Sequence, residues 1–186
     1  MSVRVLALVG SLRAGSHNLQ LAHLAARLSP EGTEISVYEG LGDLPFYNED
    51  IDREGLLPDA AARLRRAAAE ADTLVLFTPE YNGTMPAVLK NAIDWLSRPF
   101  GAGALTGKPV AVIGTAYGQY GGVWAHDEAR KAVRIAGATP LEDITLSIPG
   151  SVERFADIHP GDDPEVVERL TDVITRLAEA TAPQAA

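Results

Sequence analysis

The chain alternates short apolar runs with longer stretches whose apolar residues recur at helical spacing, and this alternation constrains its fold most. The first run, Val3–Val9, is apolar apart from Arg4, which is typical of a strand buried on both faces of a parallel sheet. Residues 18–28 follow with leucines on one helical face and a proline and a glycine behind them, which predicts a helix. The pattern repeats in predicted strands at 34–38, 73–78, 109–115 and 139–146, and in predicted helices near 56–71, at 86–96, near 124–136 and at 164–180.

Strands and helices in strict alternation imply a parallel sheet with helices on both faces, joined by right-handed crossovers. The length of 186 residues fits one domain. We expect that domain to span residues 1–181 as a doubly wound five-stranded sheet, with a disordered tail at 182–186. Ligands of such sheets bind outside the carboxyl ends of the strands, where the strand order reverses. The functional residues are therefore expected just after Val9, Thr78 and Thr115.

Composition excludes several classes of function. The chain has no cysteine, which excludes a disulfide framework, an iron–sulfur cluster and a thiol nucleophile, so any electrons that it handles need a cofactor. The formal net charge of −9 disfavours a broad surface for nucleic acid or an anionic membrane. The apolar run behind Arg4 is shorter than the ~7–15 residues of a signal-peptide core, and no stretch approaches the ~18 of a membrane span. We expect a cytoplasmic protein with no nucleic-acid or membrane partner.

The loop after the first strand, residues 10–18, has the chemistry of a phosphate site. Gly10 permits a tight turn, two serines and Asn18 offer side-chain donors, and Arg13 offers a planar guanidinium. The start of the predicted helix adds free backbone N–H groups. The structural alternative is an ordinary helix start, with Ser16 or Asn18 as N-cap and Arg13 in solvent.

Two better-known phosphate loops do not match. Gly10 and Gly15 are spaced as in a Walker A loop, but Ser16 and His17 stand where its Lys-Ser/Thr would follow. The GxGxxG fingerprint fails as well, because residues 12–13 replace its second glycine and the residue after it. These departures disfavour a nucleoside triphosphatase and a plain Rossmann dehydrogenase.

A second loop, residues 78–86, follows the third predicted strand. Two prolines and a glycine fix its shape, and Pro86 suits the first position of a helix. A rigid loop of this kind can form a wall for a flat ring. The structural alternative is a loop without ligand, with Tyr81 and Trp95 as core or interface aromatics.

Four segments in their order and spacing resemble the NAD(P)H-dependent FMN reductase family, the flavodoxin-like proteins that include quinone and chromate reductases. They are GSLRAGSHN, LPFYNEDID, TPEYNGTMPAVLKNAIDWLSRP and GKPVAVIGTAYGQYGG, and the resemblance runs from about Val3 to Ala136. It implies a five-stranded sheet in the order 2-1-3-4-5, with FMN bound where the order reverses and NADPH or NADH as co-substrate.

The resemblance also assigns residues. The positions that match the family's phosphate loop are Ser11, Arg13, Ser16 and Asn18, with the backbone N–H of His17 between the last two. Those that match the segment lining the isoalloxazine ring are Pro79, Glu80, Tyr81, Asn82 and Gly83. Those that match the loop whose backbone approaches the N1 and O2 side of the ring are Ala116, Tyr117, Gly118, Gly121 and Gly122. Tyr117 and Gln119 are candidates only, and Glu80 has an alternative assignment at a subunit interface.

The implied reaction transfers a hydride from the nicotinamide to flavin N5 and then two electrons to a quinone or a similar small acceptor, without a catalytic side chain. Three alternatives remain open: a flavin reductase that releases FMN, a non-enzymatic flavodoxin-type electron shuttle, and a binding or signalling module without flavin. The resemblance further implies a homodimer or homotetramer with a surface near Trp95, although plain core packing accounts equally for that tryptophan.

Several other sequence features do not indicate a function. Residues 50–55 copy the opening of an EF-hand loop, but its twelfth position is Ala61 instead of glutamate, so we expect a solvated acidic loop that could help form an interface. The four histidines show no ligand spacing, and no metal is predicted. No GxSxG motif supports a serine hydrolase. A cluster of three arginines, Arg63, Arg65 and Arg66, is predicted to form a solvated helix face.

Overall fold

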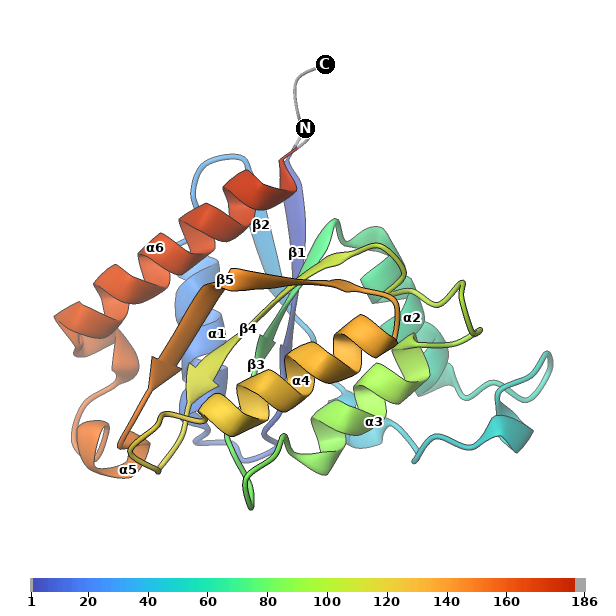
Figure 1. Ribbon diagram of the computed structural model, residues 1–186, viewed down its shortest axis with the longest axis horizontal. Helices are drawn as coiled ribbons and strands as arrows, with labels where there is room; N and C mark the ends of the chain where they lie inside the picture. The colour runs from blue at the N-terminus through green and yellow to red at the C-terminus, as the bar shows by residue number, and fades with distance from the viewer. Residues whose placement is uncertain (1, 183–186) are drawn as a thin grey trace.

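The computed structural model describes residues 2–182, which fold around a five-stranded sheet in the order β2-β1-β3-β4-β5 (Figure 1). The strands are β1 (Val3–Val9), β2 (Thr33–Val37), β3 (Thr73–Phe77), β4 (Pro109–Thr115) and β5 (Thr139–Ile148). All four neighbouring pairs are parallel. The predicted flavodoxin-like sheet and its order are therefore confirmed.

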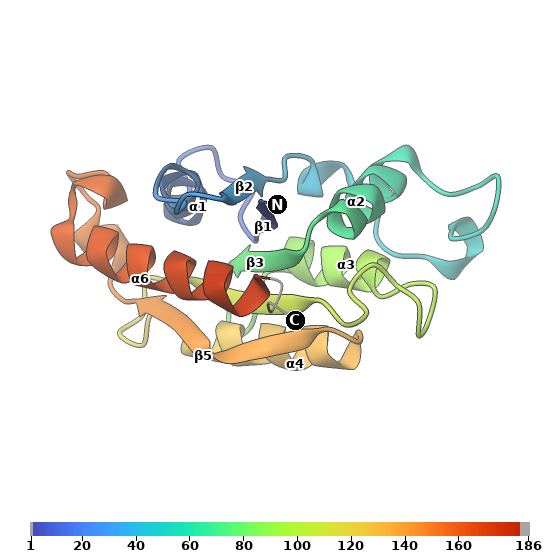
Figure 2. The ribbon, with the colours of Figure 1, turned by 90° about the horizontal axis from the view of Figure 1, so that it is seen from above.

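Helices cover both faces of the sheet (Figure 2). One face carries α1 (His17–Arg27) and α6 (Pro164–Thr181), and the other carries α2 (Asp59–Glu70), α3 (Ala87–Leu96) and α4 (Val123–Ile135). Successive side chains of a strand point to opposite faces. In β1, Val5 and Ala7 pack towards α1 and α6, while Leu6 and Leu8 pack towards α2 and α3. This double burial explains why the strands are apolar runs without alternation.

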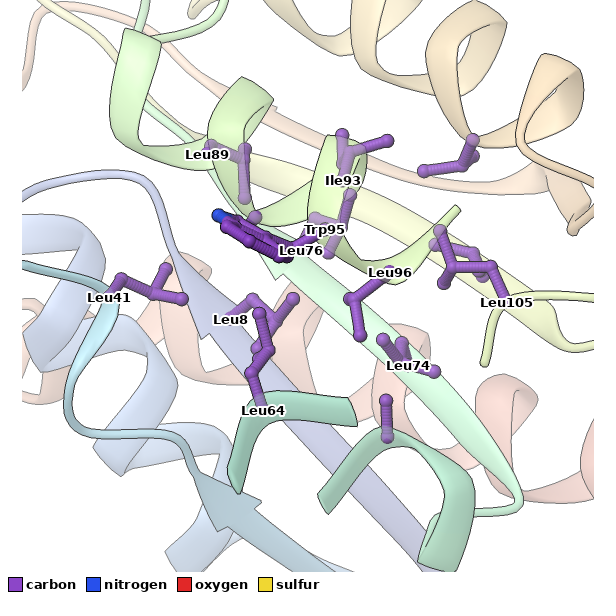
Figure 3. Packing of buried hydrophobic residues seen from close by; sticks show 14 of the residues in the cluster. Leu8, Leu41, Leu64, Leu74, Leu76, Leu89, Ile93, Trp95, Leu96 and Leu105 are labelled. Atoms are coloured by element: carbon purple, nitrogen blue, oxygen red, sulfur yellow. The ribbon is translucent and has the colours of Figure 1, made fainter. Parts of the chain in front are cut away.

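Trp95 of α3 lies in the core on the α2–α3–α4 face and has no exposed surface. Figure 3 shows its ring beside Leu76 and Ile93. The indole N–H donates to the backbone carbonyl of Pro45 at 2.8 Å, so the polar end of the ring is satisfied. Core packing, and not a surface role, accounts for Trp95.

The loop that precedes α2 departs from the expectation of a solvated acidic segment. The Asp52 carboxylate accepts two hydrogen bonds from Arg65, at 2.7 and 2.8 Å, and the side chains are only 11% and 19% exposed. The Arg65 guanidinium also donates to the carbonyl of Trp95 and lies 5.4 Å from its ring. The predictions of solvation were wrong for Asp52 and Arg65, because each charge neutralises the other. They hold for Arg63 and Arg66, which are exposed.

Four short helical segments were not predicted, because three or four residues are too few to show a helical period. They are η1 (Leu41–Asp43), η2 (Glu49–Ile51), α5 (Ser151–Arg154) and η3 (Pro160–Asp162). Strand β5 continues to Ile148, two residues beyond its predicted end. The predicted disordered tail lies outside the described residues except for Ala182, whose N–H caps α6 by donating to Ala178. No helix within residues 2–182 is long and apolar enough to cross a membrane.

Candidate functional site

Three loops meet at the carboxyl ends of the central strands, as the sequence predicts. The N–H of Gly10 donates to Phe77 at 2.8 Å, and the N–H of Thr78 donates to Ile113 at 3.0 Å, so the loops after β1, β3 and β4 begin side by side. A Cβ at Gly10 would lie 3.1 Å from the hydroxyl of Thr78. The first two loops also flank the point where the strand order reverses, between β1 and its neighbours β2 and β3.

Asn18 ties the first loop to the third. Its side-chain amide donates to the carbonyl of Thr115 at 2.9 Å and accepts from the N–H of Thr115 at 3.0 Å, and the residue is buried. A Cβ at Gly114 would come within 2.6 Å of Asn18 Oδ1 and 2.4 Å of the Thr78 carbonyl, so only glycine fits there. The Asn18 side chain therefore holds the loops together, and its backbone N–H remains free for a ligand.

The first loop presents cationic and N–H groups at the start of α1. Ser16 is the N-cap and accepts from the N–H of Leu19 at 3.3 Å, which confirms one of its two predicted roles. The N–H groups of His17 and Asn18 find no acceptor within residues 2–182. Arg13 lies over Gly15, where a Cβ would be 3.2 Å from its Nη1, and none of the ion pairs among the described residues involves it. This arrangement suits a phosphate.

The imidazole of His17 packs against another side chain. Its ring packs edge-on against Phe155, with the centroids 5.2 Å apart. Burial lowers the pKa of His17, and the nearby Arg13 and His159 lower it further. Because the ring is neutral and packs edge-on against Phe155, the backbone N–H is the group that His17 can offer to an anionic ligand.

The second loop is a tight hairpin. Tyr81 and Thr84 form an antiparallel bridge with hydrogen bonds of 2.9 and 3.2 Å. Between them Asn82 and Gly83 both have positive φ, 54° and 78°, which is the backbone of the Asn-Gly turn. Tyr81 is 51% exposed, so it is not a core aromatic. The hairpin confirms that the loop has the tight turn which its glycine predicts.

Glu80 joins the second loop to the start of α4. Its Oε2 accepts from the N–H groups of Trp124 and Ala125, at 3.1 and 3.2 Å, in the first turn of α4. A carboxylate at this position also offsets the positive end of the helix dipole. The side chain of Glu80 thus has a structural role inside the chain, which its alternative assignment to a subunit interface did not anticipate.

The third loop depends on two glycines. Gly121 and Gly122 have φ of 65° and 91°, and a Cβ at Gly121 would lie 2.8 Å from the nitrogen of Ile148. Both polar backbone groups of Ala116 are used, since its N–H donates to Ile148 and its carbonyl accepts from Ser151. The N–H groups of Tyr117 and Gly118 have no acceptor in the described part of the chain. These two N–H groups are therefore available to a ligand.

His126 lies beneath the third loop and is a feature that the sequence did not reveal. It is fully buried, with Nδ1 2.9 Å from the hydroxyl of Ser147, and a Cβ at Gly122 would be 3.4 Å from Nε2. Burial, assisted by Arg130, lowers the pKa of His126 to about 4. The ring is therefore neutral near pH 7. Its position beside Ala125 and Ala129 on the buried face of α4 is the only sequence signal for it.

The site fits a flat cofactor with an anionic tail. Arg13 and the free end of α1 match the tail, and the hairpin with the free N–H groups of Tyr117 and Gly118 matches the ring. No cluster of three or more metal-ligating side chains occurs within residues 2–182.

Comparisons with known proteins agree with this description. The sequence pattern of the NADPH-dependent FMN reductase family matches residues 3–153. A 2-hydroxy-1,4-benzoquinone reductase from a Burkholderia species is 43% identical over 130 residues, covering 70% of this chain and 69% of that protein. A quinone reductase from Pseudomonas putida is 41% identical over 153 residues, covering 82% and 81%. Among solved structures, FerB, a flavoenzyme NAD(P)H:(acceptor) oxidoreductase from Paracoccus denitrificans, has a TM-score of 0.83 at 30% identity and covers 95% of this chain and 96% of its own.

Proposed function

The chain belongs to the NADPH-dependent FMN reductase family, and on that basis we propose that it uses FMN to reduce a quinone or a similar small acceptor with NAD(P)H. In the balanced reaction, NAD(P)H, a proton and the quinone give NAD(P)⁺ and the hydroquinone. One observation carries the assignment to this site: Arg13 forms no ion pair among the described residues and lies close to Gly15, in the loop that leads to the free N–H groups at the start of α1.

We assign the FMN phosphate to the first loop. Arg13 supplies a charge-assisted hydrogen bond, and the helix start supplies backbone N–H groups. The hydroxyl of Ser16 caps α1 through its oxygen, so its hydrogen is free to donate. The proposed phosphate ligands are Ser11, Arg13 and Ser16 through their side chains, and His17 and Asn18 through their backbone.

We assign the isoalloxazine ring to the second and third loops. The hairpin at Pro79, Glu80, Tyr81, Asn82 and Gly83 forms one wall of the ring site. The third loop, Ala116, Tyr117, Gly118, Gly121 and Gly122, forms its edge. Within it the N–H groups of Tyr117 and Gly118 are the donors, while Ala116, Gly121 and Gly122 hold the backbone in place.

When bound, FMN supplies the redox chemistry, since it accepts a hydride and releases two electrons. The residues of this chain bind and orient. The N–H groups of Tyr117 and Gly118 place partial positive charge at the ring edge, where negative charge accumulates on reduction. The hairpin fixes the plane of the ring, because its turn and its two prolines leave it little freedom. No general base is required of the site, and His126 is buried and neutral.

An absorbance spectrum tests the proposal. The purified full chain, with FMN added, should show a flavin band near ~450 nm that NADPH or NADH bleaches anaerobically, and a quinone should restore it. A protein that binds no FMN, or whose flavin is not bleached, contradicts the proposal. Loss of the flavin on dilution would identify FMN as a substrate that is released, and retention would identify a prosthetic group.

We also propose assembly into a homodimer or homotetramer through the outer face of α3 and α4. Phe100 and Ile135 are 86% and 75% exposed beside this face, where a groove of about 570 Å³ reaches down to Met85 and Ile93. Exposed apolar side chains around a groove favour association. Light scattering should give a mass of two or four chains, and Ile135→Glu should lower it. A monomeric native chain would contradict the proposal.

We propose that the protein acts in the cytoplasm, supported by its need for NAD(P)H as reductant. Cell fractionation of the native host should find the protein with cytoplasmic markers. Recovery with envelope fractions would contradict the proposal.

A further inference from the structure

A cavity of about 760 Å³ opens beside the third loop. One side is formed by the loop after β4, and the other by the segment 149–153 at the end of β5, which lie next to each other in Figure 1. The N–H of Ser151 donates to Ala116 at 3.0 Å, so the two sides are joined. Glu80 of the second loop also lines the cavity. The cavity therefore adjoins the proposed ring site, with which it shares four lining residues. The other lining residues have no assigned ligand; they are Gln119, Tyr120, Trp124, Pro149, Gly150 and Glu153.

The wall of this cavity is aromatic. Tyr117, Tyr120 and Trp124 line it and are 71%, 57% and 54% exposed. The rings of Tyr120 and Trp124 are 5.6 Å apart and tilted by 53°. Three exposed large aromatic side chains around one hollow are costly to leave in water, and their faces and edges are suited to contact with another flat ring.

The charge of the cavity is negative. Glu80 and Glu153 are the charged residues of its lining, which includes no lysine, arginine or histidine. Glu153 forms no ion pair with any residue between 2 and 182, whereas its neighbour Arg154 is turned to Asp163 and Glu165, at 2.7 and 2.8 Å.

The N-terminus of α4 is a positive feature close to the cavity, and it is already occupied. Helix N-termini commonly bind anions. Here the Glu80 carboxylate accepts the N–H groups of Trp124 and Ala125, so an anionic ligand would compete with a carboxylate of this chain. The arrangement is opposite to that of α1, whose first N–H groups are free and lie near Arg13.

We propose that this cavity receives the ring of the electron acceptor and selects neutral or cationic aromatic acceptors against anionic ones. The inference rests on the proposed function and specifies its substrate class. A flat ring gains contact with Tyr117, Tyr120 and Trp124, and a positive charge on it gains cation–π and Coulomb attraction. A sulfonate or a metal oxyanion meets two carboxylates and no cation. Neutral quinones are preferred to oxyanions on this basis.

Ring binding is tested without turnover by NMR on the FMN-loaded full chain. The two tryptophans give two indole N–H signals, and Trp124→Phe assigns them. The redox-inert probes are 2-naphthylmethylammonium and naphthalene-2-sulfonate, which carry opposite charges on the same ring. We expect the ammonium probe to shift the Trp124 signal and leave that of buried Trp95 unchanged. The sulfonate should bind at least roughly fivefold more weakly.

Charge selection is tested by kinetics with two acceptors, 1,2-naphthoquinone and its 4-sulfonate. Glu153→Lys should raise kcat/KM for the sulfonate relative to the parent quinone by roughly three- to tenfold, because it reverses a charge at the cavity. Comparing the ratio between variants cancels the different intrinsic reactivity of the two quinones. Glu31→Lys is the matched control, since Glu31 is exposed at the opposite end of the sheet, just before β2, and changes the net charge equally.

The outcomes separate this inference from the proposed function. A protein that binds FMN and oxidises NAD(P)H, but whose Trp124 signal ignores the ammonium probe, overturns the inference alone. Equal binding of the two probes, or an equal change of ratio in Glu153→Lys and Glu31→Lys, overturns it as well. Failure to bind or reduce FMN overturns the proposed function, whatever the probes do. A selective Trp124 shift with a ratio change confined to Glu153→Lys supports the inference.

Discussion

Asn18 and Thr115 lie 97 residues apart in the chain and exchange two hydrogen bonds, from Asn18 Nδ2 to the Thr115 carbonyl and from the Thr115 N–H to Asn18 Oδ1. The first residue belongs to the start of α1 and the second to the end of β4. The pair therefore sets the spacing between the proposed phosphate end and ring end of the site.

Asn18→Ala should destabilise the fold. It leaves two buried backbone groups of Thr115 unpaired, which should lower the free energy of unfolding by roughly 2–5 kcal/mol. Gln20→Ala is the control on the same helix, because Gln20 Oε1 has no partner among the described residues, and its cost should stay within about 0.5 kcal/mol. Urea unfolding of the flavin-free proteins measures both, and equal costs would show that the Asn18–Thr115 pair contributes nothing.

Arg13→Ala should weaken FMN binding without unfolding the protein. A charge-assisted hydrogen bond to phosphate contributes ~1.5–3 kcal/mol, so the dissociation constant should rise by roughly 10- to 150-fold. Arg66→Ala removes an equal charge from the exposed side of α2 and should leave the dissociation constant unchanged. Flavin fluorescence titration gives both values. An unchanged constant in Arg13→Ala would remove Arg13 from the phosphate site.

Asp52→Asn should release the loop before α2. The Arg65 guanidinium holds the pKa of Asp52 below its usual range, so the pair is charged at neutral pH. Removing one partner of this mostly buried pair should cost roughly 2–4 kcal/mol. Asp50→Asn breaks an exposed pair with Arg53 in the same loop and should cost less than about 1 kcal/mol. Thermal unfolding compares the two, and similar losses would contradict the structural role of Asp52.

The pH dependence of stability should reveal the lowered pKa of His126. Its pKa in the folded protein is about 4, below the ordinary 6.5 of an unfolded chain. Between these values the unfolded state binds the extra proton, so stability is complete above pH 6.5 and falls as the pH falls towards 4. The loss from pH 7 to pH 5 should be about 2 kcal/mol. His126→Asn should remove that part of the slope, and an unchanged slope in urea unfolding would contradict it.

The strands and helices of this fold could be predicted from the sequence because each has its own local pattern of apolar residues. Double burial makes each strand a continuous apolar run, and Leu21, Leu24 and Ala25 mark one face of α1 before any tertiary contact is known. The alternation also placed the loops after Val9, Thr78 and Thr115 at one end of the sheet, whereas the strand order and the assignment of these loops to a flavin came from the resemblance. In most elements the predicted boundaries differ from those in the structure by only one or two residues.

What the sequence did not reveal is pairing between distant polar side chains. Arg65 stands between two exposed arginines and looked like them, because its partner Asp52 is identifiable only once the loop is folded. Asn18 was expected to face a ligand, and its side chain instead bonds to the backbone of another strand. The Glu80 carboxylate likewise accepts a hydrogen bond from the first turn of α4. These three residues were interpreted by residue type alone. The role of each depends on its hydrogen-bond partner, which the residue type does not specify.

The segment 149–153 touches the third loop through its backbone, by the N–H groups of Gly150 and Ser151, while Val152 and Glu153 project into solvent. Substitutions at these two positions therefore need not disturb the hydrogen bonds that join this segment to the third loop. We therefore expect acceptor preference to change with residue 153 independently of the affinity for FMN, so that a saturation library at this one position would alter the choice of acceptor without loss of the cofactor.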